Sequence, residues 1–425
     1  MSMSVGKRSV VVHLPVQQDQ PTGLLNQVHM TMPDNYSPDV EDKHYRRADI
    51  PLDHYHSIGR GTQATVIGAQ LQNGKMRRVA AKRYKMDELK GDKSHKWLMR
   101  ELQNTQYLVH PHIVRCLDTF YEKDQHGKLL YTWIVTERME TTLDKYFKRL
   151  NAPEKIHRPR DHRHIAALMT QLFMALDFLH HRGVMHRDLN PKNVGLNLQD
   201  FKIKILDFGC SGLTDSDGLQ TTKNRVGTPP LYRPPELLVE HVVYDSGVDV
   251  WAVALIAVEM LGNKLFLPRN YKQSPAFNQE QLREQGQVSV LLQILTILGL
   301  PEHRYVETFH NHFLKTAACP SQLAYALVEP LNRLGPDSSA LTKSDLQELL
   351  CKILIFDPRR RPTPAECLRH PYLSRMHDKY RQTAPIQDGK SDLERLDEML
   401  QLYSKKLEPV GNREELNAEM DFSNN

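Results

Sequence analysis

The sequence predicts an α+β protein of two lobes, a small strand-rich lobe followed by a larger helical lobe. In residues 54–86, apolar and polar residues alternate on both sides of the turn-like stretch QNGK, which predicts three antiparallel strands. Residues 94–109 carry apolar side chains near helical spacing, and two strand-like stretches follow them. Beyond about residue 139 most segments show a helical apolar pattern, which predicts the second lobe.

Length, charge and cysteine usage exclude several classes of protein. The chain has 425 residues, 40% of them hydrophobic, which is enough for a sizeable core. Its formal net charge of +5 is not gathered into one long run, so charge alone predicts no nucleic-acid partner. No stretch approaches the about 18 apolar residues of a membrane span, and no signal peptide is apparent. The five scattered cysteines predict neither a disulfide framework nor a zinc site, so we expect the cytoplasm, the nucleus or both.

The chain is expected to have three segments. Residues 1–48 are polar and without a sustained period, which predicts a disordered N-terminal tail. The main domain is expected at 49–376, with its first lobe at 49–138 and its second at 139–376. Residues 377–425 form an extension in which SDLERLDEMLQLYSKKLE predicts one amphipathic helix. We expect this helix to pack on its own second lobe rather than on another copy, and we therefore expect a monomer.

A glycine turn between the first two predicted strands is the first candidate for a binding site. IGRGTQATV places Gly59 and Gly61 in this turn, where missing side chains let backbone N–H groups approach phosphate oxygens. Ala64 stands where a third glycine would complete the GxGxxG pattern. The turn by itself is more typical of an ordinary hairpin than of a nucleotide-binding loop.

Four charged or polar positions follow the turn in a set order. VAAK places Lys82 on the inner face of a strand, and a lysine withdrawn from water there would need an acidic partner such as Glu101 on the next helix. Each charge alone is more often a solvated surface residue. HRDLNPKN then brings Asp188, and ILDFG brings Asp207, a hard carboxylate of the kind that suits Mg²⁺.

In this order and spacing, residues from about 50 to 376 resemble the eukaryotic protein kinases. The resemblance implies the bilobal protein-kinase fold, with Mg²⁺ and ATP as cofactors and proteins as substrates. It implies that Asp188 accepts the proton of the substrate hydroxyl and that Lys82, oriented by Glu101, holds the α and β phosphates. Asn193 and Asp207 would bind magnesium. The nucleotide site that it implies contains Ile58, Gly59, Gly61, Val66, Ala80, Lys82, Thr136, Glu137, Met139 and Gly195.

Other stretches resemble the branch of cyclin-dependent and mitogen-activated kinases, the second group more closely. IVTERMETTL is similar to its strand and hinge, which implies that Thr136 is the gatekeeper beside the adenine and that 137–139 form the hinge. YRPPE and DPRRRPT resemble the segments in which a glutamate, here Glu236, pairs with an arginine, here Arg361. Asp249 in DVW would hold the catalytic loop, the stretch HRDLNPKN at residues 186–193. The branch is of the serine/threonine type, so we expect a signalling kinase of that type.

The segment after DFG departs from this group. Counting back from Thr228 places Lys223 and Arg225 where a Thr-x-Tyr pair is expected. An upstream kinase is therefore expected to act on Thr221 or Thr222, where a phosphate could pair with Arg187. An added proline in TPPLYRPPE leaves proline-directed specificity open.

The catalytic loop carries the departure that bears most on activity. Asn190 stands where the resemblance predicts a lysine, and it cannot supply that charge to the transition state. Lys192 is a candidate substitute, although adjacent residues of an extended loop point apart. Gly195 stands where the resemblance predicts a small apolar residue, and it is expected to widen the base site slightly and to loosen nucleotide binding. The prediction is an active kinase of reduced rate, and the alternative is a pseudokinase scaffold that binds nucleotide or partner proteins with little phosphotransfer.

Overall fold

A computed structural model of the chain describes residues 56–60, 64–73, 75–89, 92–152, 160–214, 219–221, 227–238, 243–263, 265–266, 279–299, 322–338 and 341–374. The predicted N-terminal tail and the C-terminal extension with its amphipathic helix lie outside these residues, and their boundaries stay predictions. Gly61 and Thr222 lie outside them as well.

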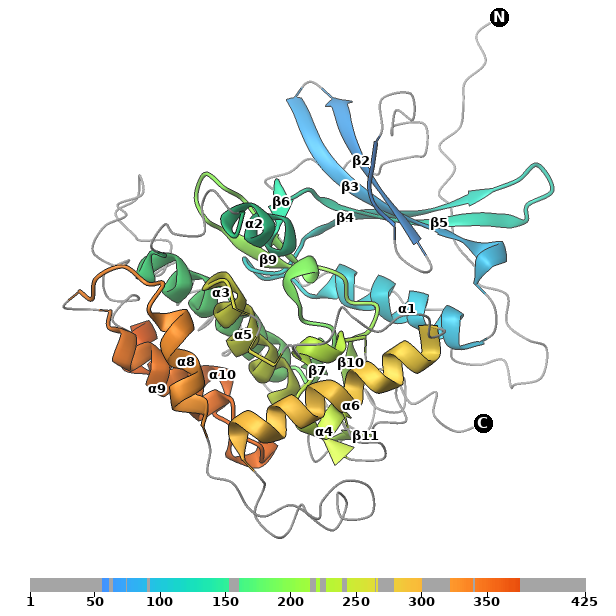
Figure 1. Cartoon of the computed structure of the whole chain (residues 1–425). Helices are drawn as coiled ribbons and strands as arrows, with labels where there is room; N and C mark the ends of the chain where they lie inside the picture. Colours follow the sequence, from blue (N-terminus) through green and yellow to red (C-terminus); the bar gives the residue numbers. More distant parts are fainter. Residues whose placement is uncertain are drawn as a thin grey trace, which may run out of the picture. The chain divides into compact units, whose positions relative to one another are not determined.

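The first lobe is built on a five-stranded antiparallel sheet in the order β1-β2-β3-β5-β4 (Figure 1). Its strands are β1 His56–Arg60, β2 Ala64–Asn73, β3 Lys75–Lys85, β4 Cys116–Lys123 and β5 Leu129–Glu137. The short helix η3, Met86–Glu88, follows β3. The expected three strands and the two that follow the helix are thus confirmed.

One helix, α1, Asp92–Tyr107, lies beside this sheet and carries Glu101 toward it. Leu98 and Leu102 of α1 pack with Tyr84 of β3 and Ile134 of β5 in one buried cluster. The opposite face of the sheet buries a second cluster around Trp133. Burial of the apolar face of α1 therefore fixes the position of Glu101 relative to β3.

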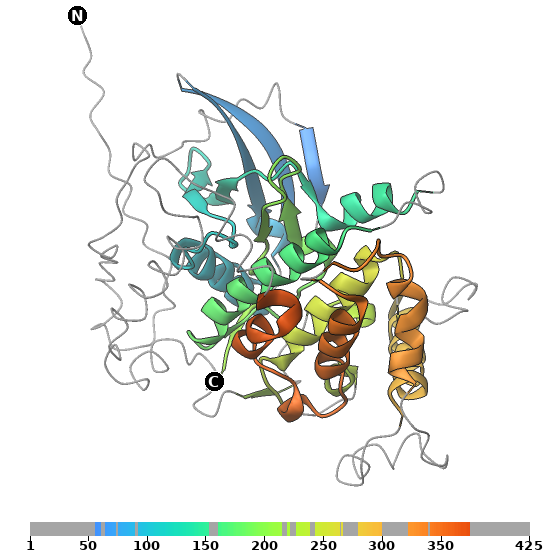
Figure 2. The same cartoon turned by 90° about the vertical axis from the view of Figure 1, so that its left-hand side faces the viewer.

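The second lobe is mostly helical, as the sequence predicts, and Figure 2 shows its helices packed side by side. They are α2 Leu143–Leu150, α3 His162–His180, α4 Pro235–Leu238, α5 Gly247–Met260, α6 Gln279–Leu298, α8 Leu323–Leu331, α9 Lys343–Ile353 and α10 Pro364–Arg369. Helices α3 and α5 pack against each other, and α5 is buried on all sides. The predicted two-lobed α+β fold is confirmed.

Short strands and single helical turns carry the loops of the second lobe. Strands β6 Thr141–Thr142, β8 Val194–Leu196 and β9 Ile203–Ile205 form one small sheet. Strand β7, Val184–Met185, pairs with β10, Gly212–Leu213, and β11, Gln220–Thr221, pairs with β12, Val243–Tyr244. The 3-10 turns are η4 Pro191–Asn193, η5 Pro230–Tyr232 and η6 Pro358–Arg360.

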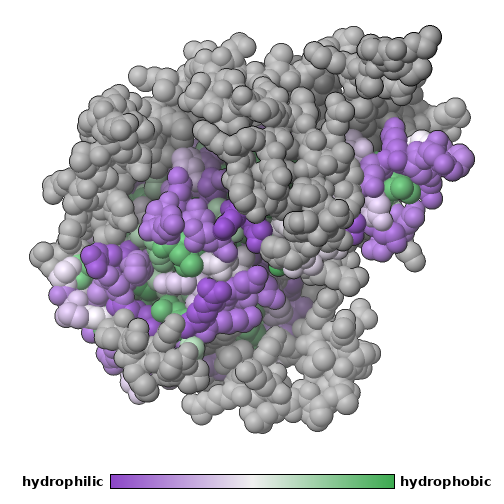
Figure 3. Space-filling model, turned by 90° about the horizontal axis from the view of Figure 1, so that it is seen from above, coloured by the Kyte–Doolittle hydropathy of each residue, from purple (hydrophilic) through white to green (hydrophobic). Residues whose placement is uncertain are grey.

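The described surface seen in Figure 3 is mainly hydrophilic, with small apolar spots between the polar side chains. Most of the large apolar side chains among the described residues lie instead in the buried cores of the two lobes, and a few, such as Tyr325, are exposed. Within the described ranges, none of the helices has both the length and the apolar character that crossing a membrane requires.

Candidate active site

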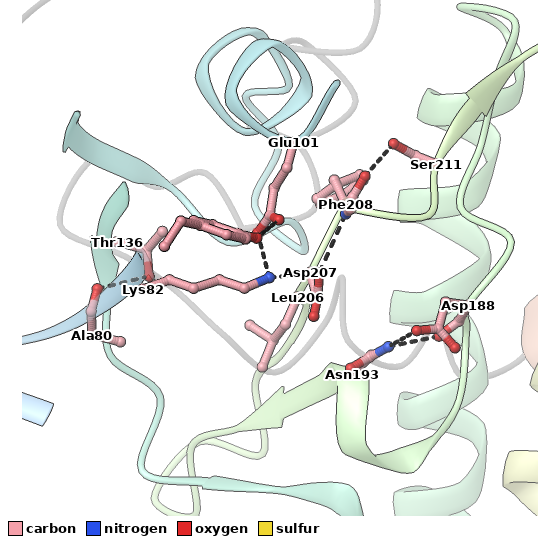
Figure 4. Close-up of polar contacts among 12 residues, drawn as sticks. Ala80, Lys82, Glu101, Thr136, Asp188, Asn193, Leu206, Asp207, Phe208 and Ser211 are labelled. Carbon is pink, nitrogen blue, oxygen red and sulfur yellow. Dashed lines mark hydrogen bonds and ion pairs between the residues drawn. The ribbon is translucent and has the colours of Figure 1, made fainter. Parts of the chain in front are cut away.

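Lys82 lies at the centre of the candidate site and is paired with two carboxylates from different elements. Its Nζ lies 2.6 Å from Oε1 of Glu101 on α1 and 2.9 Å from Oδ1 of Asp207 (Figure 4). Burial acts to lower the pKa of Lys82, but the charges of Asp207 and Glu101 outweigh it and hold this pKa well above its usual value. Lys82 is therefore a fixed positive charge beside Asp207.

Tyr84 is a member of this group that the sequence analysis missed. Its hydroxyl donates to Oε2 of Glu101, and the Lys82 ammonium lies 5.4 Å from the centre of its ring. Burial, and then the charge of Glu101, raises the pKa of Tyr84 well above its usual value, so the phenol keeps its proton as a donor. Since strand side chains alternate with period two, Tyr84 lies on the same face as Lys82, and this period was the available signal.

Asp249 of α5 holds the catalytic loop, as the family resemblance implies. Its Oδ2 accepts from the His186 backbone N–H at 2.8 Å, and its Oδ1 accepts from the Arg187 N–H at 2.9 Å. His180, at the end of α3, lies 3.0 Å from Oδ2 through Nε2 and was not predicted. Burial acts to raise the pKa of Asp249, but His180 and the donors of the loop outweigh it and keep the pKa below its usual value.

Two side-chain amides hold the carboxylate of Asp188. Asn193 donates through Nδ2 to Oδ2 at 2.9 Å, as Figure 4 shows, and Asn190 donates through Nδ2 to Oδ1 at 3.0 Å. Burial, followed by the negative charge of Asp207, raises the pKa of Asp188 to about 7. A carboxylate with a pKa near neutrality is well matched to accepting a proton from a hydroxyl.

Asn190 and Lys192 take different parts in this loop. Asn190 is buried, and its Oδ1 accepts from the Lys192 backbone N–H at 3.0 Å while its Nδ2 contacts Asp188. The Lys192 side chain is exposed, and in the described part of the chain its ammonium forms no ion pair. The role of Lys192 as a substitute for the missing lysine charge therefore stays a prediction.

Asp207 and Asn193 are the oxygen ligands that could hold magnesium. Asp207 has a positive φ of 61° and a side chain that is 42% exposed. Partial withdrawal from water acts to raise its pKa, but Lys82 outweighs this and keeps the pKa below its usual value, so the group is ionised. Asn193 spends its Nδ2–H on Asp188, which leaves its amide oxygen for a cation.

This donor set fits Mg²⁺ held together with phosphates. Hard carboxylate and amide oxygens suit Mg²⁺, which takes few protein ligands and keeps nucleotide phosphates or waters as the others. Among the described residues, no cluster of three or more His, Cys, Asp or Glu side chains could hold a metal ion alone. A cation at Asp207 and Asn193 would therefore share its shell with the phosphates that Lys82 attracts.

The predicted nucleotide residues come from facing strands of the first lobe and from the segment after β5. Gly59 pairs with Val66, and Ala80 pairs with Thr136, whose hydroxyl donates to the Ala80 carbonyl at 3.4 Å. Ile58 lies beside Gly59 on β1 and is half-buried. Gly61 lies outside the described residues.

The hinge is held by its side chains as well as by its backbone. Glu137 accepts from the Arg115 N–H at 2.7 Å and pairs with Lys204 at 2.6 Å. A Cβ added at Gly68 of β2 would lie 2.5 Å from Nη1 of Arg138, so the absence of a side chain at Gly68 makes room for that guanidinium. Contacts with both lobes therefore restrict where the backbone of 137–139 can lie.

The expectation that Gly195 widens the base site is corrected by Met139. A Cβ added at Gly195 would lie 2.4 Å from Cγ and 2.8 Å from Cβ of Met139, so the Met139 side chain fills the space that the glycine leaves. The two residues are far apart in sequence, and only the antiparallel pairing of β6 with β8 brings their segments together.

The segment that follows the site is anchored to the second lobe. Arg361 donates to both carboxylate oxygens of Glu236, at 2.5 and 2.7 Å, and this pair is buried, as the resemblance implies. Arg233 donates through Nε to the Thr228 carbonyl at 2.5 Å. Thr221 contributes its backbone to β11, and Thr222 lies outside the described residues.

Comparisons with known proteins agree with this geometry. A family model described as the protein kinase domain matches residues 52–373. Mitogen-activated protein kinase 15 of Xenopus laevis is 29% identical over 357 residues, which cover 82% of this chain and 53% of that protein. Mitogen-activated protein kinase pmk-1 of Caenorhabditis elegans is 28% identical over 323 residues, 76% of this chain and 75% of that protein.

A third relative, mitogen-activated protein kinase 12 of Rattus norvegicus, is 29% identical over 283 residues, 66% of each chain. The match thus spans about half the length of the Xenopus laevis relative and about two thirds or more of the other two. Because the family model covers most of the chain, including Lys82, Asp188 and Asp207, the chain belongs to the protein kinase family and is similar to the mitogen-activated protein kinases.

Proposed function

We propose that the protein is an active serine/threonine kinase that transfers the γ-phosphate of Mg·ATP to proteins in a pathway similar to those of mitogen-activated kinases. The observation that carries this proposal is the double ion pair of Lys82, at 2.6 Å from Glu101 and 2.9 Å from Asp207. Phosphoryl transfer depends mainly on positioning and charge, and these three side chains are the ones that would receive the phosphates and the metal.

The chain's own residues divide the work in the following way. Lys82 binds phosphate oxygens and is kept in place by Glu101 and Tyr84. Asp188 accepts the proton of the substrate hydroxyl, while Asn190 and Asn193 fix the directions of its two oxygens. Mg²⁺, when bound, supplies positive charge to the transferring phosphate.

The partners follow from the same proposal. Substrates are proteins that carry serine or threonine, and we propose a monomer in the cytoplasm, the nucleus or both.

Thr221 or Thr222 is the proposed site of an upstream kinase. A phosphate there would act at a place other than Arg187, because the Arg187 guanidinium is buried and bonded within the protein. Proline-directed specificity is a finer question that peptide substrates can answer.

Phosphotransfer to peptides tests the proposal directly. The purified full chain is incubated with γ-labelled Mg·ATP and paired serine and threonine peptides, with and without proline after the acceptor. We expect transfer that Asp207→Ala abolishes, because it removes a magnesium ligand and a partner of Lys82. Glu348→Ala, an exposed carboxylate on α9, is the control for loss of an acidic side chain and should transfer as the native chain does.

The competing function is a pseudokinase scaffold, and the observation that favours it is the buried, uncharged Asn190 beside Asp188. A scaffold would bind nucleotide through Lys82 without transferring phosphate. Nucleotide binding that is lost in Lys82→Ala, together with transfer no greater than that of Asp207→Ala for all peptides, would favour the scaffold over the kinase.

A further inference from the structure

All three guanidinium nitrogens of Arg187 in the catalytic loop are bonded within the protein. The residue is 2% exposed and has a positive φ of 60°. Its Nε donates to the Cys210 carbonyl at 2.8 Å, its Nη2 to the Ser211 carbonyl at 2.8 Å, and its Nη1 to the Tyr244 hydroxyl at 3.2 Å. Each nitrogen of the guanidinium therefore has a protein oxygen as partner, and two of these oxygens belong to the segment just after DFG.

Gly212 makes room for this arrangement. A Cβ added at Gly212 would lie 2.5 Å from Cζ, 2.6 Å from Nη2 and 2.8 Å from Nη1 of Arg187. All three distances are too short for a real carbon atom, so the guanidinium packs directly on the glycine backbone. Gly212 also pairs with Met185 in the β10–β7 ladder, one residue before the catalytic loop begins at His186.

Tyr244 contacts the catalytic loop, the segment that follows DFG and a buried apolar cluster of the second lobe. It is 1% exposed and packs with Met185, Leu237 and Val248. Its backbone pairs with Gln220 in the β12–β11 ladder, so it also holds a later part of the segment that follows DFG. Through its hydroxyl it contacts Arg187, whose own N–H is held by Asp249.

The backbone carbonyl of Arg187 is also held, in this case by Thr228. The Thr228 hydroxyl and backbone N–H both donate to the Arg187 carbonyl, at 2.6 and 3.1 Å. The two peptide groups on either side of Arg187 are thus both held, one through the Arg187 N–H and the other, which leads into Asp188, through the Arg187 carbonyl.

We propose that Tyr244 and Gly212 are positioning residues, which hold Arg187 between the catalytic loop and the segment after DFG so that this junction needs no phosphate. A phosphate that reached Arg187 would have to displace the Tyr244 hydroxyl and two carbonyls. Those buried groups would then lose their donors, which is costly. The consequence for catalysis rests on the proposed kinase function, whereas the internal hold on Arg187 does not.

The test must also detect the opposite arrangement, in which Arg187 binds a phosphate instead of its partners within the protein. Arg100 of α1 lies near Arg187: burial lowers the pKa of Arg100, and the positive charge of Arg187 lowers it further. Two neighbouring guanidinium groups would attract a phosphate if Arg187 were released. In that case the ordered junction would depend on phosphorylation.

Backbone hydrogen exchange separates the two cases without requiring turnover. The full chain is treated with phosphatase, checked by intact mass, and compared with the untreated protein in peptides covering 184–189 and 207–214. We expect equal protection before and after treatment, and faster exchange of both peptides in Tyr244→Phe and Gly212→Ala. Val243→Ala, on the same strand but 48% exposed, should exchange as the native chain does. Loss of protection on dephosphorylation, or native protection in Tyr244→Phe, would overturn the proposal.

Steady-state kinetics then tests the positioning role. In Tyr244→Phe we expect kcat to fall about tenfold, as for loss of one hydrogen bond to a charged group, with the KM for Mg·ATP unchanged. A mainly destabilising effect would lower the active fraction, which active-site titration measures. A native kcat in Tyr244→Phe would contradict the positioning role. Loss of the native chain's activity after phosphatase treatment would contradict it as well. If the native chain transfers no phosphate at all, the proposed function fails, while the exchange experiment still decides whether Arg187 is held internally.

Discussion

The side-chain amide of Asn190 donates to Oδ1 of Asp188 at 3.0 Å, so the residue that replaces the expected lysine still contacts the aspartate that we propose as the proton acceptor. It also accepts from the Lys192 N–H, which fixes its amide in one orientation. The geometry of the proton acceptor is therefore kept while the positive charge is absent. A kinase with this loop should be slow because it lacks electrostatic stabilisation, not because Asp188 is misplaced.

Restoring the charge should raise the rate. We expect Asn190→Lys to increase kcat by about tenfold to a hundredfold, somewhat less than the full effect of a preorganised charge because the cap on the Lys192 N–H is lost. Asn190→Gln, which is longer but uncharged, is the matched control and should not exceed the native rate. Initial rates at saturating Mg·ATP and peptide measure the effect. A rate for Asn190→Lys at or below the native one would show that the missing charge does not limit transfer.

The rate should depend on the protonation of Asp188. Its pKa is raised to about 7 by burial and by Asp207, so protonation below about pH 7 removes the acceptor and lowers kcat/KM. A lysine at position 190 would stabilise the carboxylate and move this acidic limb to lower pH. Profiles of kcat/KM between about pH 5 and 9 for the native chain and Asn190→Lys check the shift. Superimposable acidic limbs would mean that another group controls them.

Removing the Tyr84 hydroxyl should weaken the site through Glu101. Tyr84→Phe leaves one oxygen of a buried carboxylate without its donor, which we expect to lower kcat/KM for Mg·ATP about tenfold. Tyr131→Phe, on the neighbouring strand β5, is the matched control, because Tyr131 lies against Arg83 rather than against Glu101. If both variants behave like the native chain, Glu101 does not depend on Tyr84.

Crowding Gly195 should reduce nucleotide affinity by displacing Met139. A methyl group at Gly195 would overlap the Met139 side chain, and overpacking of this kind typically costs about 1–3 kcal/mol. We expect Gly195→Ala to weaken ATP binding about fivefold or more, and Met139→Ala in the same chain to recover part of the loss. Calorimetry or a fluorescent nucleotide measures all four members of the cycle. Additive effects of the two substitutions would exclude the contact as the cause.

Two buried histidines should make the fold sensitive to acid. Burial, and then neighbouring positive groups, lowers the pKa of His110 to about 3, and burial lowers that of His112 to about 4. The unfolded chain takes up these protons near pH 6.5 and the folded chain does not, so stability is complete above that pH and falls as the pH decreases. We expect a loss of about 2 kcal/mol per histidine between pH 7 and 5.

Urea unfolding at the two pH values measures this loss. His110→Asn keeps an acceptor for the His112 N–H, which His110 accepts at 3.1 Å, but it cannot titrate in this range. The variant should therefore lose less stability than the native chain over the same interval, whatever its stability at pH 7. An equal pH dependence in both proteins would assign the acid sensitivity to other groups.

The sequence by itself determined the order of the elements and the positions of the main chemical groups. Alternation in residues 54–86 and helical spacing after residue 139 depend only on which face of a strand or helix is apolar, so the two lobes could be predicted locally. Lys82, Asp188 and Asp207 lie in motifs whose letters and spacing identify them before any fold is known. Glu236 and Arg361, 125 positions apart, could be paired only because the family resemblance supplied the partner.

Only the tertiary structure decided which atoms these groups meet. Tyr84 reaches Glu101 because α1 packs on the face of β3 that carries both Tyr84 and Lys82. Met139 fills the space at Gly195 because β6 and β8 pair, which reverses an expectation drawn from the glycine alone. Arg187 finds its partners at Cys210, Ser211 and Tyr244 through chain packing across as many as 57 positions. Hydrogen bonds and steric fit act over a few ångströms in space, and a sequence records separation along the chain instead.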